Sequence, residues 1–121
     1  MRKVDLEGII PTVVGCGQAG FSPDGTPVLA AQLDSPYGLA IAKEGVVYLA
    51  DSRNNRVRRV TADGVLETVA GSDMAGEAGE GGPATAAHLN EPHGLCFYGD
   101  DVLLISDHYN NRVKAVKLSA P

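Results

Sequence analysis

A seven-residue stretch, Asp51-Ser52-Arg53-Asn54-Asn55-Arg56-Val57, decides the fold because it returns later as Asp107-His108-Tyr109-Asn110-Asn111-Arg112-Val113. In both places an apolar run precedes the stretch, and a run rich in valine and basic residues follows it. Asparagine tolerates a positive φ and its side chain bonds nearby backbone, so a pair of asparagines between two strand-like runs indicates a β-hairpin turn. The sequence therefore predicts two equivalent hairpins.

The polar frame of this stretch is predicted to be structural rather than directly functional. A carboxylate that flanks the turn can accept N–H groups of the loop, or it can pair with the nearby guanidinium of Arg56. The residues assigned this structural role are Asp51, Asn54, Asn55 and Arg56, with their counterparts Asp107, Asn110, Asn111 and Arg112.

The match between the two copies extends far beyond the hairpin. Val4, Val60 and Val116 lie 56 residues apart, and many glycines, prolines and leucines coincide at the same spacing without a gap. An internal duplication with a period in the tens of residues, built of short strands, is typical of a propeller or another repeat array.

Composition and charge limit the function classes. With 44% hydrophobic and 21% charged residues the chain is globular rather than disordered. The formal charge of −5 argues against a nucleic-acid-binding or anionic-membrane surface, and no apolar run is long enough to cross a bilayer. The basic residues after the turns are predicted to be solvated charges at strand edges, namely Arg56, Arg58, Arg59, Arg112, Lys114 and Lys117.

The two cysteines do not occupy equivalent positions, because Cys16 aligns with Ser72 and Cys96 aligns with Ala40. They therefore do not form a repeated staple. Cys96 stands in an apolar strand and is predicted to act as a small hydrophobic residue, with a single disulfide as the open alternative.

Along the chain, each repeat is predicted to be a four-stranded antiparallel meander with one long connection to the next. Residues 9–14 form an outer edge strand, because Pro11 cannot donate to a central ladder. Residues 38–70 form a complete unit, and residues 94–118 supply the three inner strands of another. The connections Gly15–Pro36 and Gly71–Pro92 exceed the usual loop length, and each contains one helical turn after a proline. The runs Val46–Ala50 and Val102–Ser106 are apolar at successive positions, which predicts burial on both faces.

Several of these segments resemble the NHL repeat, which builds the blades of six-bladed β-propellers. The resemblance covers nearly the whole chain in two copies, and its first copy consists of Pro36–Ala40, Val47–Asp51 and Asn54–Val60. The run Gly20-Phe21-Ser22-Pro23-Asp24-Gly25-Thr26-Pro27 also resembles the insert of the bacterial and teneurin-type subgroup, although Pro23 and Thr26 depart from its pattern. The second copy keeps the end of this run but has Glu77 and Ala78 in place of phenylalanine and serine.

The run Gly15-Cys16-Gly17-Gln18-Ala19-Gly20 follows a predicted strand and has the glycine spacing of a dinucleotide-binding turn. Its context excludes that reading, because no helix opens at Gly20 and no parallel βαβ unit follows. The equivalent run in the second copy also lacks the middle glycine.

The candidate binding residues are Tyr37, His93, Arg53 and Tyr109. Tyr37 and His93 share one repeat position, just before the glycine that opens the inner strand, and in a propeller this position faces the mouth of the central channel. Arg53 and Tyr109 belong to the hairpin turns on the same side as the long inserts, and the acidic residues of these inserts favour a basic or neutral protein or glycan over nucleic acid. His88 and His108 are interpreted as ordinary surface histidines. The function expected is a non-enzymatic protein-interaction or scaffold module, with a propeller enzyme or metal site as the competing class.

The strand order predicts a homotrimer. Two blades alone leave apolar faces open, and three copies give the six blades that the resemblance implies. The segment Ile9–Val14 lacks a blade, and residues 94–118 lack an outer strand, so each N-terminus is expected to complete a neighbour's blade by strand exchange. In that assembly Met1–Asp5 and Val113–Lys117 compete for one place.

The alternative function is a zinc site made of three copies of His93 at the channel mouth, since three imidazoles with an open fourth position suit catalytic zinc. The Pro92-His93-Gly94-Leu95 run resembles the zinc-ligand motif of the peptidyl-α-hydroxyglycine lyases, six-bladed propellers with one such histidine on every second blade. The catalytic arginine and tyrosine of those lyases cannot be placed in this sequence, so the resemblance implies only the metal site. The simpler interpretation is that His93 caps the inner strand, and no other cofactor is expected.

Overall fold

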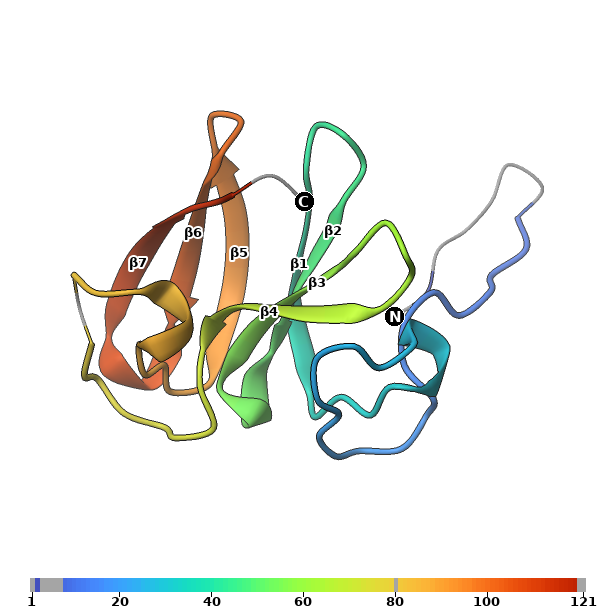
Figure 1. Cartoon of the computed structure of the whole chain (residues 1–121), viewed down its shortest axis with the longest axis horizontal. Helices are drawn as coiled ribbons and strands as arrows, with labels where there is room; N and C mark the ends of the chain where they lie inside the picture. Colours follow the sequence, from blue (N-terminus) through green and yellow to red (C-terminus); the bar gives the residue numbers. More distant parts are fainter. Residues whose placement is uncertain (1, 3–7, 80, 120–121) are drawn as a thin grey trace.

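The computed structural model describes residues 2, 8–79 and 81–119, and its strands form two antiparallel sheets that stand side by side (Figure 1). The first sheet has the order β1-β2-β3-β4 and the second has the order β5-β6-β7. The elements are η1 (Val28–Ala30), β1 (Pro36–Ile41), β2 (Val47–Asp51), η2 (Ser52–Asn54), β3 (Arg56–Val60), β4 (Leu66–Gly71), η3 (Ala84–Ala86), β5 (Pro92–Tyr98), β6 (Val102–Asp107), η4 (His108–Asn110) and β7 (Arg112–Lys117).

The two sheets repeat each other in register as well as in sequence. Pro36 pairs with Asp51 in the first sheet and Pro92 pairs with Asp107 in the second, and each pairing is followed by a bulge. At the hairpins, η2 and η4 each end in an asparagine with positive φ, which is 57° at Asn55 and 53° at Asn111. The hairpin prediction from the asparagine pairs is therefore confirmed.

The main core lies between the two sheets, where Tyr48, Val57 and Ala70 of the first sheet pack with Leu103 and Ile105 of the second. The strand β2 is buried along nearly its whole length, as predicted for a strand covered on both faces. The prediction is wrong for β6, whose burial alternates. Among the described residues, β6 has a sheet against only one of its faces.

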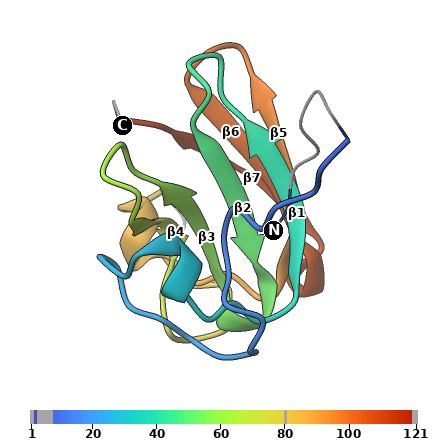
Figure 2. The same ribbon diagram turned by 90° about the vertical axis from the view of Figure 1, so that its right-hand side faces the viewer.

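The inner strands β1 and β5 approach closely, and both views show them side by side (Figure 2). A Cβ added at Gly38 would collide with the carbonyl oxygen of His93, so glycine is required there. The hydroxyl of Ser52 donates to the carbonyl of Pro92, and the N–H of Glu91 donates to Oδ1 of Asn55 over 3.0 Å. The hairpin of the first sheet therefore fixes the start of the second.

The N-terminal segment corrects one expectation. Residues 9–14 do not form a strand, and their pairing is an isolated bridge between Arg2 and Thr12. Pro11 lacks an N–H, and the described chain brings only Arg2 alongside this segment, so a ladder does not develop. The expectation for Met1–Asp5 lies outside the described residues, apart from Arg2.

The helical turns, cysteines and basic residues divide between confirmation and correction. The turns η1 and η3 follow Pro27 and Pro83 as predicted. Cys16 and Cys96 are both free and exposed, so Cys96 is not a core residue, because its side of β5 is uncovered. Arg58 and Arg59 are buried, so the prediction of solvated edge charges is wrong for both. No helix in the described ranges is long and apolar enough to span a membrane.

Candidate functional site

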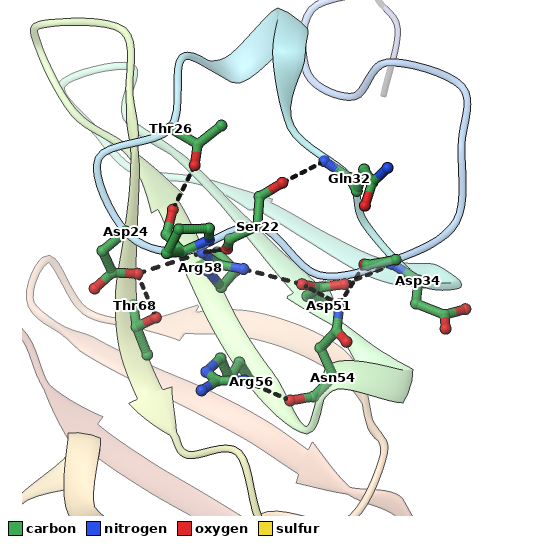
Figure 3. Close-up of polar contacts among 12 residues, drawn as sticks. Ser22, Asp24, Thr26, Gln32, Asp34, Asp51, Asn54, Arg56, Arg58 and Thr68 are labelled. Atoms are coloured by element: carbon green, nitrogen blue, oxygen red, sulfur yellow. Dashed lines mark hydrogen bonds and ion pairs between the residues drawn. The ribbon is translucent and has the colours of Figure 1, made fainter.

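Asp51 organises the first repeat from a fully buried position (Figure 3). Its Oδ1 accepts the N–H of Asp34 over 2.8 Å, and its Oδ2 accepts the amide of Asn54 over 2.9 Å and Nη1 of Arg58 over 3.1 Å. Burial raises the pKa of Asp51 above its ordinary value of 3.8, although these donors and the Arg58 charge oppose the shift. The carboxylate thus joins the hairpin to the end of the long insert.

Arg58 extends this network into the insert. Its Nη2 donates to the carbonyl of Ser22 over 2.6 Å and to Oδ1 of Asp24 over 3.3 Å, and the same Asp24 oxygen accepts the hydroxyl of Thr68 over 2.7 Å. The Phe21 ring lies near two guanidinium groups, 4.4 Å from Arg56 and 5.3 Å from Arg58. One buried cation therefore holds the insert against β3 and β4.

The predicted partner of Asp51 was wrong, because Arg58 and not Arg56 pairs with the carboxylate. The guanidinium of Arg56 instead donates to the Asn54 carbonyl over 3.4 Å and lies over Phe21. A strand alternates its side chains between two faces, and the insert covers the face on which Arg58 lies. The structural roles of Asp51, Asn54 and Asn55 agree with the prediction.

The second repeat uses the same frame with fewer links to its insert. Asp107 accepts the N–H of Asn90 over 2.8 Å and the amide of Asn110 over 2.7 Å. Lys114 replaces the arginine, lying 3.4 Å from Asp107 and donating to the His88 carbonyl over 3.3 Å. The remaining pair, Arg112 with Glu77, is 3.9 Å apart and exposed.

Four rings form a continuous row across the two sheets, which we call the aromatic row: Tyr37, His93, His108 and Tyr109. Tyr37 and His93 stack with centroids 4.2 Å apart, and His93 stacks on His108 at 4.1 Å with an interplanar angle of 13°. His108 meets Tyr109 at 4.6 Å. Tyr37 is 65% exposed and Tyr109 is 57% exposed, so both ends of the row are open to solvent.

The row explains where the predicted binding residues lie. It contains Tyr37, His93 and Tyr109, at the start of β1, the start of β5 and in η4, on the lower side of Figure 1. Arg53 is exposed in η2, and its N–H bonds the Asp34 carbonyl over 3.1 Å, but no ring contact joins it to the row. His108, interpreted from sequence as an ordinary surface histidine, is the residue that completes the row. Its replacement of Ser52 was the available signal.

No group of three or more His, Cys, Asp or Glu residues that could hold a metal ion occurs within the part of the chain that the structure describes. His93 and His108 lie together, but they stack face to face. A three-histidine site would thus require residues from more than one copy of the chain.

Residues 16–78, just over half of the chain, match the family model of the teneurin NHL domain. The chain belongs to the teneurin NHL domain family. The resemblance of its repeats to NHL blades is thereby confirmed, and the matched range includes the first insert. The two sheets are accordingly called the first blade (β1–β4) and the second blade (β5–β7) below.

The relatives are much longer than this NHL chain. Teneurin-4 of Homo sapiens is 33% identical over 104 residues, which cover 75% of this chain and 4% of that protein. A crystal structure of a protein of unknown function from Bacteroides thetaiotaomicron matches with a TM-score of 0.82 at 23% identity, over 94% of this chain and 28% of its own. An auxiliary nutrient binding protein from Bacteroides ovatus matches with a TM-score of 0.65 at 22% identity, over 98% of this chain and 32% of its own. These two structures share the fold.

Proposed function

We propose that this NHL chain is a non-enzymatic interaction module that binds a neutral or basic protein or glycan through its aromatic row. The observation that carries the proposal is the row itself, with Tyr37 and Tyr109 exposed at its two ends. Exposed aromatic rings combine a large apolar face with a polar edge, and such residues are enriched in binding surfaces. The row is also wide enough to offer several faces to one ligand.

The surroundings of the row favour the same class of ligand. Asn54 donates to the Gly20 carbonyl over 2.8 Å and Asn110 donates to the Gly76 carbonyl over 2.6 Å, so both hairpins are bonded to their inserts. The second insert carries exposed acidic side chains at Asp73 and Glu77. This local negative charge, with a net charge of −5 for the chain, favours basic and neutral ligands over polyanions.

We further propose that the module acts as a six-bladed propeller made of three copies. The odd-numbered side chains of β1 form an exposed apolar surface, at 65% for Tyr37, 49% for Leu39 and 60% for Ile41. Their counterparts 56 residues later are His93, Leu95 and Phe97, and Leu95 and Phe97 pack against the first blade. The strand β1 thus presents to another copy the kind of surface by which β5 joins the first blade.

Binding is tested by comparing the wild-type chain with Tyr37→Ala and Tyr109→Ala on a glycan array and on a panel of purified cell-surface proteins. Lys43→Ala and Asp100→Ala are the controls, because this exposed pair lies in the turns at the opposite end of the sheets. We expect the ring variants to lose at least tenfold in affinity and the controls to retain it. Equal binding by all four variants would contradict the assignment of the row.

Assembly is tested separately by light scattering of the wild-type chain. The expected mass is three times the chain mass of 12.5 kDa. A folded monomer or dimer would rule out the three-copy propeller.

A further inference from the structure

The second blade has an uncovered edge with a cavity behind it. In the first blade β3 pairs with both β2 and β4, whereas β7 pairs only with β6 among the described residues. A cavity of about 330 Å³ lies along β7 and is lined by Ala70, Leu89, Ile105 and residues 113–117, together with glycines and alanines of the second insert. The cavity is therefore apolar, apart from Lys114 and Lys117.

In the first blade the side chain of Leu66 occupies the corresponding place. Leu66 is buried in β4 and packs with Val14, Ala31 and Leu33. Its N–H donates to the Thr26 carbonyl over 3.0 Å, and its own carbonyl accepts the N–H of Gly25 over 2.8 Å. A blade of this type is thus completed by one aliphatic residue that the insert holds from both sides.

Residues 8–15 have the features of β4 without its place in a sheet. Ile10 is the counterpart of Leu66 at the spacing of 56 residues, and it is 54% exposed. Gly8 has a φ of 81° where Gly64 has 78°, and both values lie in the left-handed region that favours glycine. The bridge between Arg2 and Thr12 repeats the pairing of Arg58 with Thr68. The segment thus already has the turn and the register of a fourth strand.

We propose that residues 8–15 of a second copy of this chain lie along β7 as the fourth strand of the second blade, with Ile10 in the cavity. The proposal rests on the assembly of copies proposed above and specifies its contact. The segment cannot fill the cavity of its own chain, because it lies at the opposite end of the molecule from β7 (Figure 1). The pairing of Val60 with Leu66 sets Val116 opposite Ile10 of the second copy. Pro11 replaces Glu67 in this strand, so the ladder has one N–H donor fewer than in the first blade.

The test is a mixed-disulfide experiment between single-cysteine chains. The background carries Cys16→Ser and Cys96→Ala, the residues that the other repeat has at these positions. Ile10→Cys and Val116→Cys chains are mixed, refolded together and oxidised, and the products are separated on a non-reducing gel. We expect a linked dimer from the mixture and no such product from either variant alone. Ile10→Cys mixed with Val113→Cys is the control, since Val113 lies three residues away along β7 and is exposed.

A second pair of variants replaces the cysteines if these disturb folding. Ile10→Asp should reduce the mass found by light scattering to that of a single chain, while Ile10→Leu, which supplies the residue of the other repeat, should keep the assembled mass. An assembled wild type that gives no Ile10–Val116 product, or an equal amount with Val113→Cys, would overturn the contact while leaving the assembly in place. A wild-type monomer would overturn both. Ligand binding by the aromatic row is decided independently by Tyr37→Ala.

Discussion

Removing Arg58 should destabilise the first blade more than any other single change of charge in the described chain. The guanidinium is fully buried and bonds three oxygen-bearing partners, Asp51, Ser22 and Asp24. Arg58→Ala leaves the Asp51 carboxylate buried without its cation and releases the insert from β3. The carboxylate keeps two donors, from Asp34 and Asn54, which limits the loss.

The size of the effect follows from the chemistry of a buried ion pair. Removing one partner of such a pair typically costs about 3–5 kcal/mol, and the two remaining donors place Arg58→Ala near the lower end, at about 3 kcal/mol. Arg58→Lys keeps a cation beside Asp51, as Lys114 does beside Asp107, but gives up the bonds to Ser22 and Asp24. Its loss should be about 1.5–2 kcal/mol, because hydrogen bonds that involve charged groups contribute roughly 1.5–3 kcal/mol.

The assay is urea unfolding followed by far-UV circular dichroism, at one fixed chain concentration because association adds to apparent stability. Arg53→Ala is the matched control, since this arginine is exposed in the neighbouring turn. The order of free energies of unfolding should be Arg53→Ala, then Arg58→Lys, then Arg58→Ala, from most to least stable. A loss below about 1 kcal/mol for Arg58→Ala, within the range of surface substitutions, would refute the assigned role.

Three further predictions concern the blade junctions, the zinc alternative and the buried carboxylate. Gly38→Ala should destabilise the chain itself, because the new Cβ meets the His93 carbonyl, whereas Gly94→Ala should leave the circular dichroism spectrum unchanged and lower the assembled mass in light scattering. If three copies of His93 bind zinc, equilibrium dialysis should find one zinc per three chains in the wild type and none in His93→Ala; metal that persists in the variant would exclude this site. Burial raises the pKa of Asp51, so its contribution to stability is fully present below pH 3.8 and is lost as the pH rises through the raised pKa. The wild type should therefore gain stability relative to Asp51→Asn as the pH is lowered towards 3.8, and parallel urea-unfolding profiles across this range would contradict the assignment.

Local chemistry made much of the fold predictable. The asparagine pairs required a turn with positive φ, and the 56-residue spacing required two copies of one unit, because both signals lie within short stretches of sequence. The partner of Asp51 was not predictable in the same way. Arg56 and Arg58 stand on the same strand at equal chemistry, and the choice between them depends on where the insert folds, which adjacent residues do not determine.

The candidate site shows the same boundary between local and distant information. Tyr37 and His93 could be paired by their shared repeat position, but His108 joins them only because the hairpin of the second blade brings its ring against β5. The segment 9–14 was predicted as a strand from its own residues, yet a strand forms only where another strand accompanies it. Its sequence could specify the turn at Gly8 but not the presence of a neighbour.

The position of His93 between the rings of Tyr37 and His108 also gives the protein a built-in spectroscopic probe. Aromatic ring currents act on both faces of this imidazole, so its carbon-bound protons should resonate well upfield of those of His88, which makes no ring contact among the described residues. A ligand that separates the stack would move these signals downfield. The chain has no tryptophan, and two of its four tyrosines lie in the row, so the same event would change a large share of its intrinsic ultraviolet fluorescence.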